Sequence, residues 1–222
     1  MNIIIANTNT IHRTIENLCV QELNAEIVNS QQELNEKILK KEIDYIFFLH
    51  WSKLIPKEIY ENYRCVVFHM TDLPFGRGGS PLQNLIVRGF TETKISAIRV
   101  EQGLDTGDIY LKKDLSLYGT AEEIFLRAGV VMFEMMKEIT ENKIIPEPQK
   151  GKPVLFKRRT PEDGSIEHID TIEQIYDHIR MLDAEGYPRA FLVNRTIKFE
   201  FSGATLKADG SICADVKISK PK

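Results

Sequence analysis

Two side chains suited to acyl transfer stand where short apolar runs end. His69 directly follows the apolar run at residues 65–68, and Asp105 lies in a glycine-containing loop after another such run. An imidazole can shuttle a proton or donate to a developing oxyanion, and a nearby carboxylate can orient it and accept a proton from an amine. Spacing alone also allows a purely structural His69. The pair is therefore a candidate catalytic site.

The elements expected to position this pair follow an α/β pattern. Residues 2–6 are mostly apolar and largely β-branched, with polar residues after them, as expected of a buried parallel strand. Further strands are predicted at residues 26–28, 45–49 and 65–68. Helix-favouring segments such as residues 31–41 separate them, which indicates a mainly parallel sheet. Ligands of such sheets bind beyond the carboxyl ends of the strands, where His69 and Asp105 are expected.

The middle of the chain contains two predicted helices and two predicted strands. Pro81 can open a helix that Gly89 ends. Strands at residues 95–100 and 109–117 flank the loop that carries Asp105. Thr120 and Glu123 form a capping box for the second helix. Its apolar stripe is predicted to pack into the core and consists of Ile124, Ala128, Val131, Met135 and Ile139.

The C-terminal part is predicted to form a small subdomain. Thr171 and Gln174 cap a helix that runs to about residue 183. Strands follow at residues 191–193, 197–201 and 212–218. The predicted domains are residues 1–160, which hold the candidate site, and residues 161–222. The β-strands within residues 190–222 are expected to serve either substrate binding or the pairing of subunits into a homodimer.

Composition limits the class of protein. The chain has 222 residues, of which 42% are hydrophobic and 27% charged, as expected for a globular protein with one main core. A net charge of −3 argues against a nucleic-acid partner. No Cys or His group shows metal-ligand spacing, and neither a signal peptide nor a membrane-length apolar run is present. We expect a cytoplasmic protein without disulfides, metal or membrane insertion.

Two blocks of sequence carry a family resemblance. Residues 69–81 read His-Met-Thr-Asp-Leu-Pro-Phe-Gly-Arg-Gly-Gly-Ser-Pro, and residues 103–108 read Gly-Leu-Asp-Thr-Gly-Asp. Their order and separation resemble the signature of the folate-dependent formyltransferase family, which includes methionyl-tRNA and sugar-nucleotide amine formyltransferases. The likeness resumes at residues 157–164 and 175–191. The resemblance implies a Rossmann-like domain that binds N10-formyltetrahydrofolate, with a catalytic Asn, His and Asp near the formyl carbon. His69 and Asp105 occupy two of these three positions.

The third position departs from the family pattern. The family's Asn stands two residues before the His, and here that residue is Val67, whose side chain cannot hydrogen-bond an oxyanion. Either His69 suffices, or another donor replaces the amide. Thr71, Gln83 and Asn84 are nearby polar candidates, although each could equally make local backbone hydrogen bonds.

Folate requires a mostly apolar slot, which the resemblance places between the loops at residues 50–55 and 100–105. The candidate folate-binding residues are Trp51, Leu54, Ile55, Val100, Gly103, Leu104 and Asp105. For Leu54 and Ile55 a place in the ordinary core is equally compatible with the sequence. The glycines at residues 76–79 lack the spacing of a phosphate-binding motif and instead predict a tight turn that admits substrate.

The predicted acceptor is the amine of a UDP- or dTDP-linked amino sugar. Candidate substrate-binding residues are Met70, Arg77, Gly78, Lys157 and Arg158. Their cations could pair with a diphosphate, or Lys157 and Arg158 could simply be a solvated basic segment. The amino-acid sequence of residues 68–81 is also similar to that of bacterial sugar N-formyltransferases, which suggests polysaccharide biosynthesis. The alternatives are a methionyl-tRNA or other amine formyltransferase, a formyltetrahydrofolate hydrolase, and a non-catalytic nucleotide-binding module.

Overall fold

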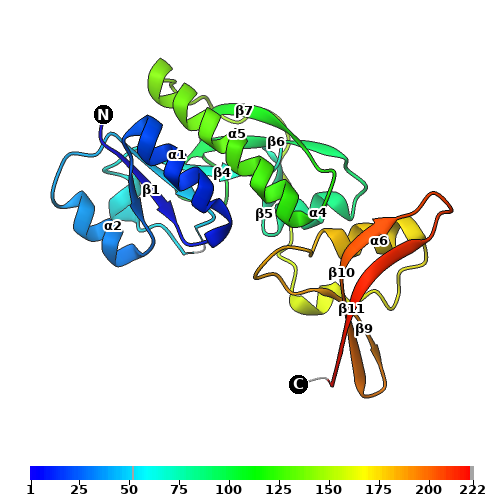
Figure 1. Ribbon diagram of the computed structural model, residues 1–222. Coiled ribbons are helices and arrows are strands. Elements are labelled where there is room, and N and C mark those ends of the chain that lie inside the picture. The colour runs from blue at the N-terminus through cyan, green and yellow to red at the C-terminus, as the bar shows by residue number, and fades with distance from the viewer. Residues whose placement is uncertain (52, 221–222) are drawn as a thin grey trace. The chain divides into compact units, whose positions relative to one another are not determined.

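The chain divides into two units. The computed structural model describes residues 1–51 and 53–220, and Figure 1 shows their helices and strands. The first unit consists of Met1–Gly78, Thr93–Leu115 and Phe125–Leu155. The second consists of Gly79–Glu92, Ser116–Ile124 and Phe156–Lys222. Whether residues 1–160 and 161–222 are separate domains stays a prediction.

A six-stranded sheet with the order β2-β1-β3-β4-β6-β7 forms the centre of the first unit. Its strands are β1 (Ile3–Asn7), β2 (Glu26–Val28), β3 (Tyr45–Leu49), β4 (Cys65–His69), β6 (Glu92–Arg99) and β7 (Ile109–Ser116). β1 pairs in parallel with β2 and β3, and β3 pairs in parallel with β4. β6 runs antiparallel to β4 and places Ser96 opposite His69. The predicted α/β class with a mainly parallel sheet is confirmed.

Helices cover the sheet, which explains why its central strands are apolar throughout. In the first unit the helical segments are η1 (Thr10–His12), α1 (Arg13–Leu23), α2 (Gln31–Ile38), α3 (Lys57–Tyr60) and most of α5 (Ala121–Asn142). The second unit contains α4 (Pro81–Ile86), η2 (Pro161–Gly164) and α6 (Ile172–Arg180). On one face, Leu34 of α2 and Ile59 of α3 belong to a buried cluster with Ile4 and Phe48. On the other face α1 and α5 lie side by side (Figure 1), joined by an ion pair between Lys137 and Glu22.

Local capping sets the start of two helices, as predicted. Thr120 N–H donates to the Glu123 carboxylate at 2.8 Å, and Glu123 N–H donates to the Thr120 hydroxyl at 3.2 Å. Gln174 N–H donates to the Thr171 hydroxyl at 3.2 Å. These bonds satisfy backbone donors that a helix cannot satisfy itself. The predicted stripe of α5 is fully buried except for Val131, which is half-buried.

The second unit contains a three-stranded antiparallel sheet with the order β11-β10-β9, as expected for the C-terminal part. Its strands are β9 (Ala190–Asn194), β10 (Ile197–Leu206) and β11 (Ile212–Ser219). Close to it, the buried Arg180 of α6 donates to the carbonyl groups of Leu117 and Gly119. The three cysteines are free, and no described helix is long and apolar enough to cross a membrane.

The glycine-rich segment after His69 is more ordered than the predicted turn. Residues Phe75–Gly78 form the short strand β5, which pairs with β8 (Val154–Phe156). Val154 N–H donates to the Pro74 carbonyl at 3.1 Å, and Gly79 N–H donates to the Phe156 carbonyl at 3.3 Å. The pairing partner is a segment that sequence periodicity did not mark as a strand.

Candidate active site

His69 lies at the carboxyl end of β4 and is almost fully buried. Its Nε2 is 2.7 Å from the Gly76 carbonyl oxygen. Because a carbonyl only accepts, we infer that Nε2 carries the hydrogen in the neutral ring. Nδ1 then presents its lone pair, and it lies 3.6 Å from Oδ2 of Asp105. The structure therefore brings together the two predicted catalytic residues and fixes which nitrogen faces the carboxylate.

Asp105 is held in place by the backbone around it. Gly78 N–H donates to Asp105 Oδ2 at 2.9 Å. Asp105 itself has a left-handed φ of 52°. A Cβ on Gly107 would lie 1.8 Å from the Arg99 carbonyl oxygen, so the loop closes only with glycine at that position. The carboxylate opposite His69 is thus positioned by a tight loop and by a backbone donor of β5.

Gln149 is a residue of this site that the sequence did not reveal. Its amide donates to the carbonyl oxygens of Asp105 and Gly107, both at 2.8 Å. Its amide oxygen accepts from Arg77 Nε at 3.1 Å and from Nη2 at 2.7 Å. One amide therefore connects Arg77 to the loop that carries Asp105. Gln149 lies 44 residues from Asp105 in a segment without a motif, so no sequence signal could have identified it.

A short backbone bridge positions Gln149. Ile109 N–H donates to the Glu147 carbonyl at 2.8 Å, and Glu147 N–H donates to the Ile109 carbonyl at 2.9 Å. These two bonds fix the segment after α5 against the start of β7. Glu147 lies two residues before Gln149, so the bridge also positions Gln149.

The three polar candidates for the missing amide are occupied with local bonds. The Gln83 amide donates to the Met181 carbonyl at 3.2 Å. The Asn84 amide donates to the carbonyls of Gly79 and Lys157, and the Thr71 hydroxyl lies 3.4 Å from the Gly76 carbonyl. These contacts favour the structural interpretation. Val67 packs against the apolar cluster beside α2 and α3.

The predicted folate-binding residues differ in burial. Trp51, Ile55 and Val100 are half-buried and pack against the same apolar cluster as Val67. Leu54 is 93% exposed and Leu104 64% exposed, and Gly103 is exposed as well. Leu54 is therefore not a core residue, because the loop turns its side chain to solvent. Residue 52 of the predicted folate loop lies outside the described residues.

The predicted substrate-binding residues are divided between the two units. In the first unit Met70 and Gly78 are buried and Arg77 is half-buried. In the second unit Lys157 and Arg158 have exposed side chains. The role of all five stays a prediction.

A pair of histidines, the buried His12 and the half-buried His50, anchors the loop that follows β3. His12 Nε2 is 2.7 Å from His50 Nδ1, and the His50 carbonyl accepts from the Thr8 hydroxyl at 2.8 Å. Within the described part of the chain, His12 Nδ1 has no hydrogen-bond partner. Burial, with a smaller effect of His50, lowers the pKa of His12 to about 3. Burial lowers the pKa of His50 to about 4. Both rings are therefore neutral near pH 7.

An α/β sheet with a histidine at the end of a central strand, beside a carboxylate from a neighbouring loop, is an arrangement suited to acyl transfer. A sequence model of the Formyl transferase family matches residues 8–127, and one of the methionyl-tRNA formyltransferase C-terminal domain matches residues 161–219. The chain belongs to the formyl transferase family.

Comparisons with individual proteins agree with this membership. A structure titled methionyl-tRNA formyltransferase from Clostridium thermocellum is 51% identical, with a TM-score of 0.95, and the match covers 100% of both chains. Methionyl-tRNA formyltransferase of Francisella philomiragia is 28% identical over 83% of this chain. HypX from Aquifex aeolicus, solved with tetrahydrofolic acid, has a TM-score of 0.76 at 16% identity, covers 92% of this chain and 38% of HypX, and shows the fold alone. This chain spans between 50% and 62% of the length of the first two curated relatives.

These relatives overturn the predicted acceptor. The names methionyl-tRNA formyltransferase contradict the expectation of a nucleotide-linked amino sugar and of polysaccharide biosynthesis. They also contradict the expectation that a nucleic-acid partner is unlikely. The physical reason is that net charge is a sum over the surface and does not report where cations gather. The motif at residues 69–81 lies around His69 and Asp105, so it reports the reaction centre rather than the acceptor.

The contacts of Gln149 predict how its removal acts. In Gln149→Ala the loop around Asp105 loses two hydrogen bonds, each worth roughly 1 kcal/mol. We expect the Gly78 amide, which donates to Asp105, to exchange with solvent deuterium about 10-fold faster. Gln102→Ala, which changes an exposed side chain of the same loop, is the control and should leave this exchange unchanged. Equal exchange in Gln149→Ala and the parent chain would contradict the positioning role.

The neutral His12 predicts a loss of stability in acid. The unfolded chain binds a proton near pH 6.5, whereas folded His12 stays neutral down to about pH 3. The unfolded state therefore binds more protons in this window, and the free energy of unfolding falls as pH decreases through it. The His12 contribution between pH 8 and pH 5 is roughly 2 kcal/mol.

Urea unfolding at these two pH values measures the effect. His12→Asn should reduce the difference in unfolding free energy between them, and His168→Gln, which alters an exposed imidazole, should retain it. The interpretation fails if His12→Asn keeps the full difference.

Proposed function

We propose that this chain transfers the formyl group of N10-formyltetrahydrofolate to the amino group of methionyl-tRNA. The observation that carries the proposal is the 51% identity, over the full length of both chains, with a structure titled methionyl-tRNA formyltransferase. The pair of His69 and Asp105 supports an acyl-transfer reaction of this kind. The reaction is expected to take place in the cytoplasm.

The half-buried apolar residues after β3 and β6 suit the formyl donor. Trp51, Ile55 and Val100 provide the mainly apolar surface that a flat pterin ring requires. The indole N–H of Trp51 is buried and has no partner within the described part of the chain, so it is a donor available to a polar atom of a bound ring. This combination of apolar contact and an unused donor fits a folate.

Cations that could hold the acceptor are present despite the negative net charge. Lys157 and Arg158 have exposed side chains, and Arg77 retains donors beyond those it gives to Gln149. Phosphate groups of a tRNA acceptor end would bind such cations through charge-assisted hydrogen bonds. We therefore retain these residues as acceptor-binding residues.

The geometry of the His–Asp pair supports an exchange of protons. An ionised Asp105 and the Nδ1 lone pair of His69 are both acceptors and lie 3.6 Å apart. They can form a hydrogen bond only when one of them carries a proton. With this proton the pair can protonate the nitrogen that leaves the formyl carbon. Without it, the pair can accept the proton that the attacking amine loses. Asp105 also orients the ring, as a carboxylate beside a catalytic imidazole does.

His69 Nε2–H is our assignment for the donor to the formyl oxygen, in place of the amide missing at Val67. In this structure that N–H donates to the Gly76 carbonyl. The formyl oxygen would have to replace this carbonyl as its acceptor.

Substitution of Asp105 separates proton transfer from positioning. Asp105→Asn keeps an oxygen that can accept from Gly78 N–H but cannot take up a proton. We expect formyl transfer to fall about 100-fold, and His69→Ala to lower it at least as much. His168→Gln is the matched control and should retain full turnover. Full turnover of Asp105→Asn from pH 6 to pH 9 would show that the carboxylate does not act in proton transfer.

A direct assay tests the substrates. The protein is incubated with N10-formyltetrahydrofolate and methionyl-tRNA, and formylmethionine released from the tRNA is measured by mass spectrometry. Uncharged tRNA and free methionine serve as controls and should give no formylated product. Formate release that is independent of any amine would instead identify a hydrolase. Folate binding without turnover would identify a non-catalytic module, and either result would overturn the proposal.

A further inference from the structure

A hollow of about 460 Å³ lies in the first unit at the edge of the sheet where β3 and β4 begin. Its lining includes Tyr45 at the start of β3, Arg64 just before β4, Arg99 at the end of β6, and Tyr110 in β7. β4 ends at His69, so Arg64 is separated from His69 by roughly 16 Å of extended chain. The hollow is therefore distinct from the candidate active site.

Two buried phenol groups of this hollow lack partners. Tyr45 is 2% exposed and Tyr110 is 8% exposed, and both line the hollow. Neither hydroxyl makes a hydrogen bond within residues 1–51 and 53–220. Burial, with a smaller effect of Tyr45, raises the pKa of Tyr110 to about 12, so this hydroxyl keeps its proton and remains a donor. Neither hydroxyl is among the enclosed polar atoms that lack a partner, so both are open to the hollow and available to donate to a bound ligand.

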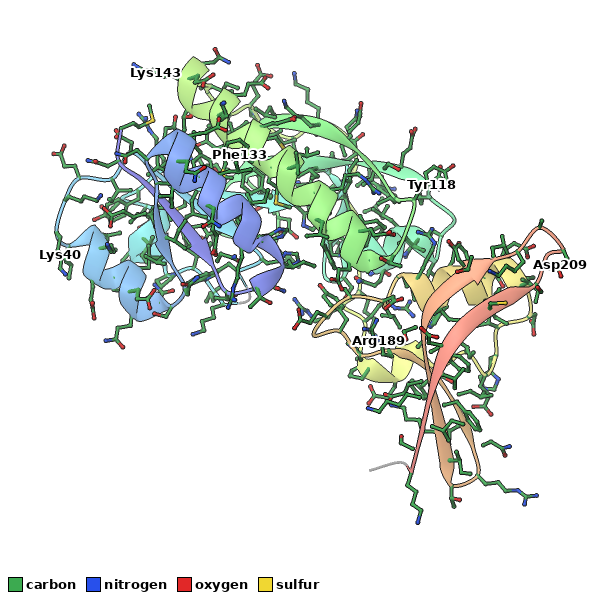
Figure 2. All side chains as sticks on the ribbon, viewed as in Figure 1. Lys40, Tyr118, Phe133, Lys143, Arg189 and Asp209 are labelled. Carbon is green, nitrogen blue, oxygen red and sulfur yellow. The ribbon has the colours of Figure 1, made fainter. Side chains whose placement is uncertain are left out.

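Cations accompany these donors. The Arg64 guanidinium lies over the Tyr45 ring, 5.5 Å from its centroid. Arg99 contacts the Glu101 carboxylate at 3.2 Å through Nε, which leaves its terminal nitrogens for other acceptors. Lys143, just beyond α5, also lines the hollow and is labelled in Figure 2. Glu61 is the one acidic residue among the described lining residues. The polar groups are thus mostly donors, as a bound anion requires.

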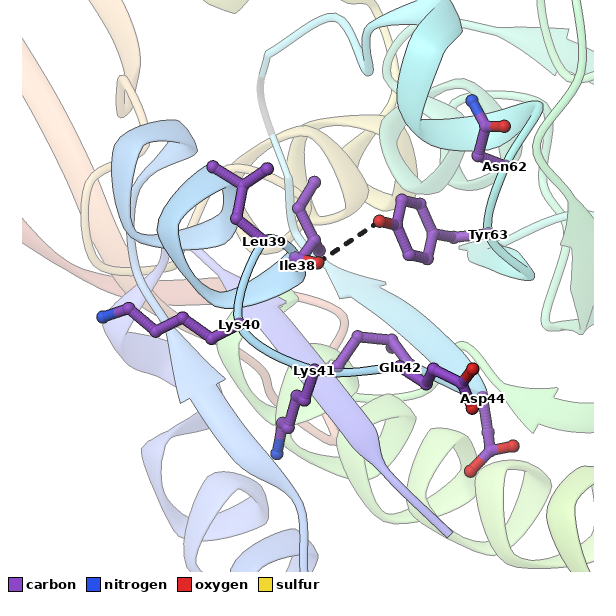
Figure 3. Close-up of a pocket in the computed structure, with 9 residues that line it drawn as sticks. Ile38, Leu39, Lys40, Lys41, Glu42, Asp44, Asn62 and Tyr63 are labelled. Atoms are coloured by element: carbon purple, nitrogen blue, oxygen red, sulfur yellow. Dashed lines mark hydrogen bonds between the residues drawn. The ribbon is translucent and has the colours of Figure 1, made fainter.

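A neighbouring hollow of about 530 Å³, shown in Figure 3, is a useful comparison because its lining offers fewer free donors. It shares Tyr63 with the first hollow, but the Tyr63 hydroxyl donates to the Ile38 carbonyl at 3.3 Å. Its charges are of both signs, and two of them are already engaged: Lys41 pairs with Glu26, and Asp44 accepts from the backbone of Asn2. No comparable set of unused donors is found in its described lining.

We propose that the hollow around Tyr45, Arg64, Arg99 and Tyr110 is a binding site for a small phosphorylated molecule. Its phosphate group would pair with the two guanidinium groups and accept from the two phenol hydroxyls. The volume exceeds that of inorganic phosphate and lies in the range of small-molecule sites. The rings of Tyr60 and Tyr63 and the side chain of Ile144 supply half-buried surface for the rest of the ligand.

Binding of inorganic phosphate and of adenosine monophosphate, measured by calorimetry on the full chain, tests this proposal. We expect the monophosphate to bind more tightly than inorganic phosphate, because it also covers the aromatic rim. Arg64→Gln should weaken both by about 10-fold, since it removes a charge-assisted bond. Tyr110→Phe keeps the ring and the packing, so it should fold normally and weaken binding about 5-fold through the lost hydroxyl.

Arg195→Gln, which removes an exposed guanidinium in the turn between β9 and β10, is the matched control. It should leave both affinities unchanged. The proposal is overturned if neither probe binds, or if Arg195→Gln weakens binding as much as Arg64→Gln does. It is also overturned if Tyr110→Phe has no effect on affinity. The assay contains no formyl donor, so its result is independent of the proposed formyl transfer.

Discussion

The hydrogen bond from Gly78 N–H to Asp105 is the interaction on which the candidate active site depends. It holds the Asp105 carboxylate opposite His69. The same strand, β5, offers the Gly76 carbonyl that fixes the other side of the imidazole. On the β5 side both contacts come from backbone groups, so only the rotamers of Asp105 and His69 themselves have to be ordered to make them. A site held in this way keeps its geometry at low entropic cost.

Further contacts extend this support outward. Gln149 binds two carbonyls of the Asp105 loop, and the bridge between Ile109 and Glu147 fixes the segment that carries it. The His12–His50 pair anchors a different loop, the one after β3 that is proposed to bind folate. The histidine pair also makes the free energy of unfolding fall in acid. The rings take up a proton in the unfolded chain but stay neutral in the folded chain, so a lower pH favours unfolding.

The position of Val67 changes how this site must work relative to the family pattern. An amide there would supply a second donor to the formyl oxygen, whereas valine adds only apolar surface continuous with Trp51 and Ile55. The polar side chains nearest in sequence give their donors to backbone carbonyls. In the proposed formyl transfer, the charge on the formyl oxygen would therefore be stabilised by the imidazole of His69.

The sequence by itself determined the order and type of most elements, the two capped helices, and His69 and Asp105 as a candidate pair that lies together. These features are local, because side-chain periodicity, capping boxes and motifs operate within a few residues. The contacts of Gln149 with Asp105 and of His12 with His50, across 44 and 38 residues, were decided only by the tertiary structure. So were the pairing of β5 with β8 and the cluster of Tyr45 and Tyr110. Such contacts depend on how loops return to the sheet, and this path is set by packing of the whole unit rather than by any short stretch of sequence.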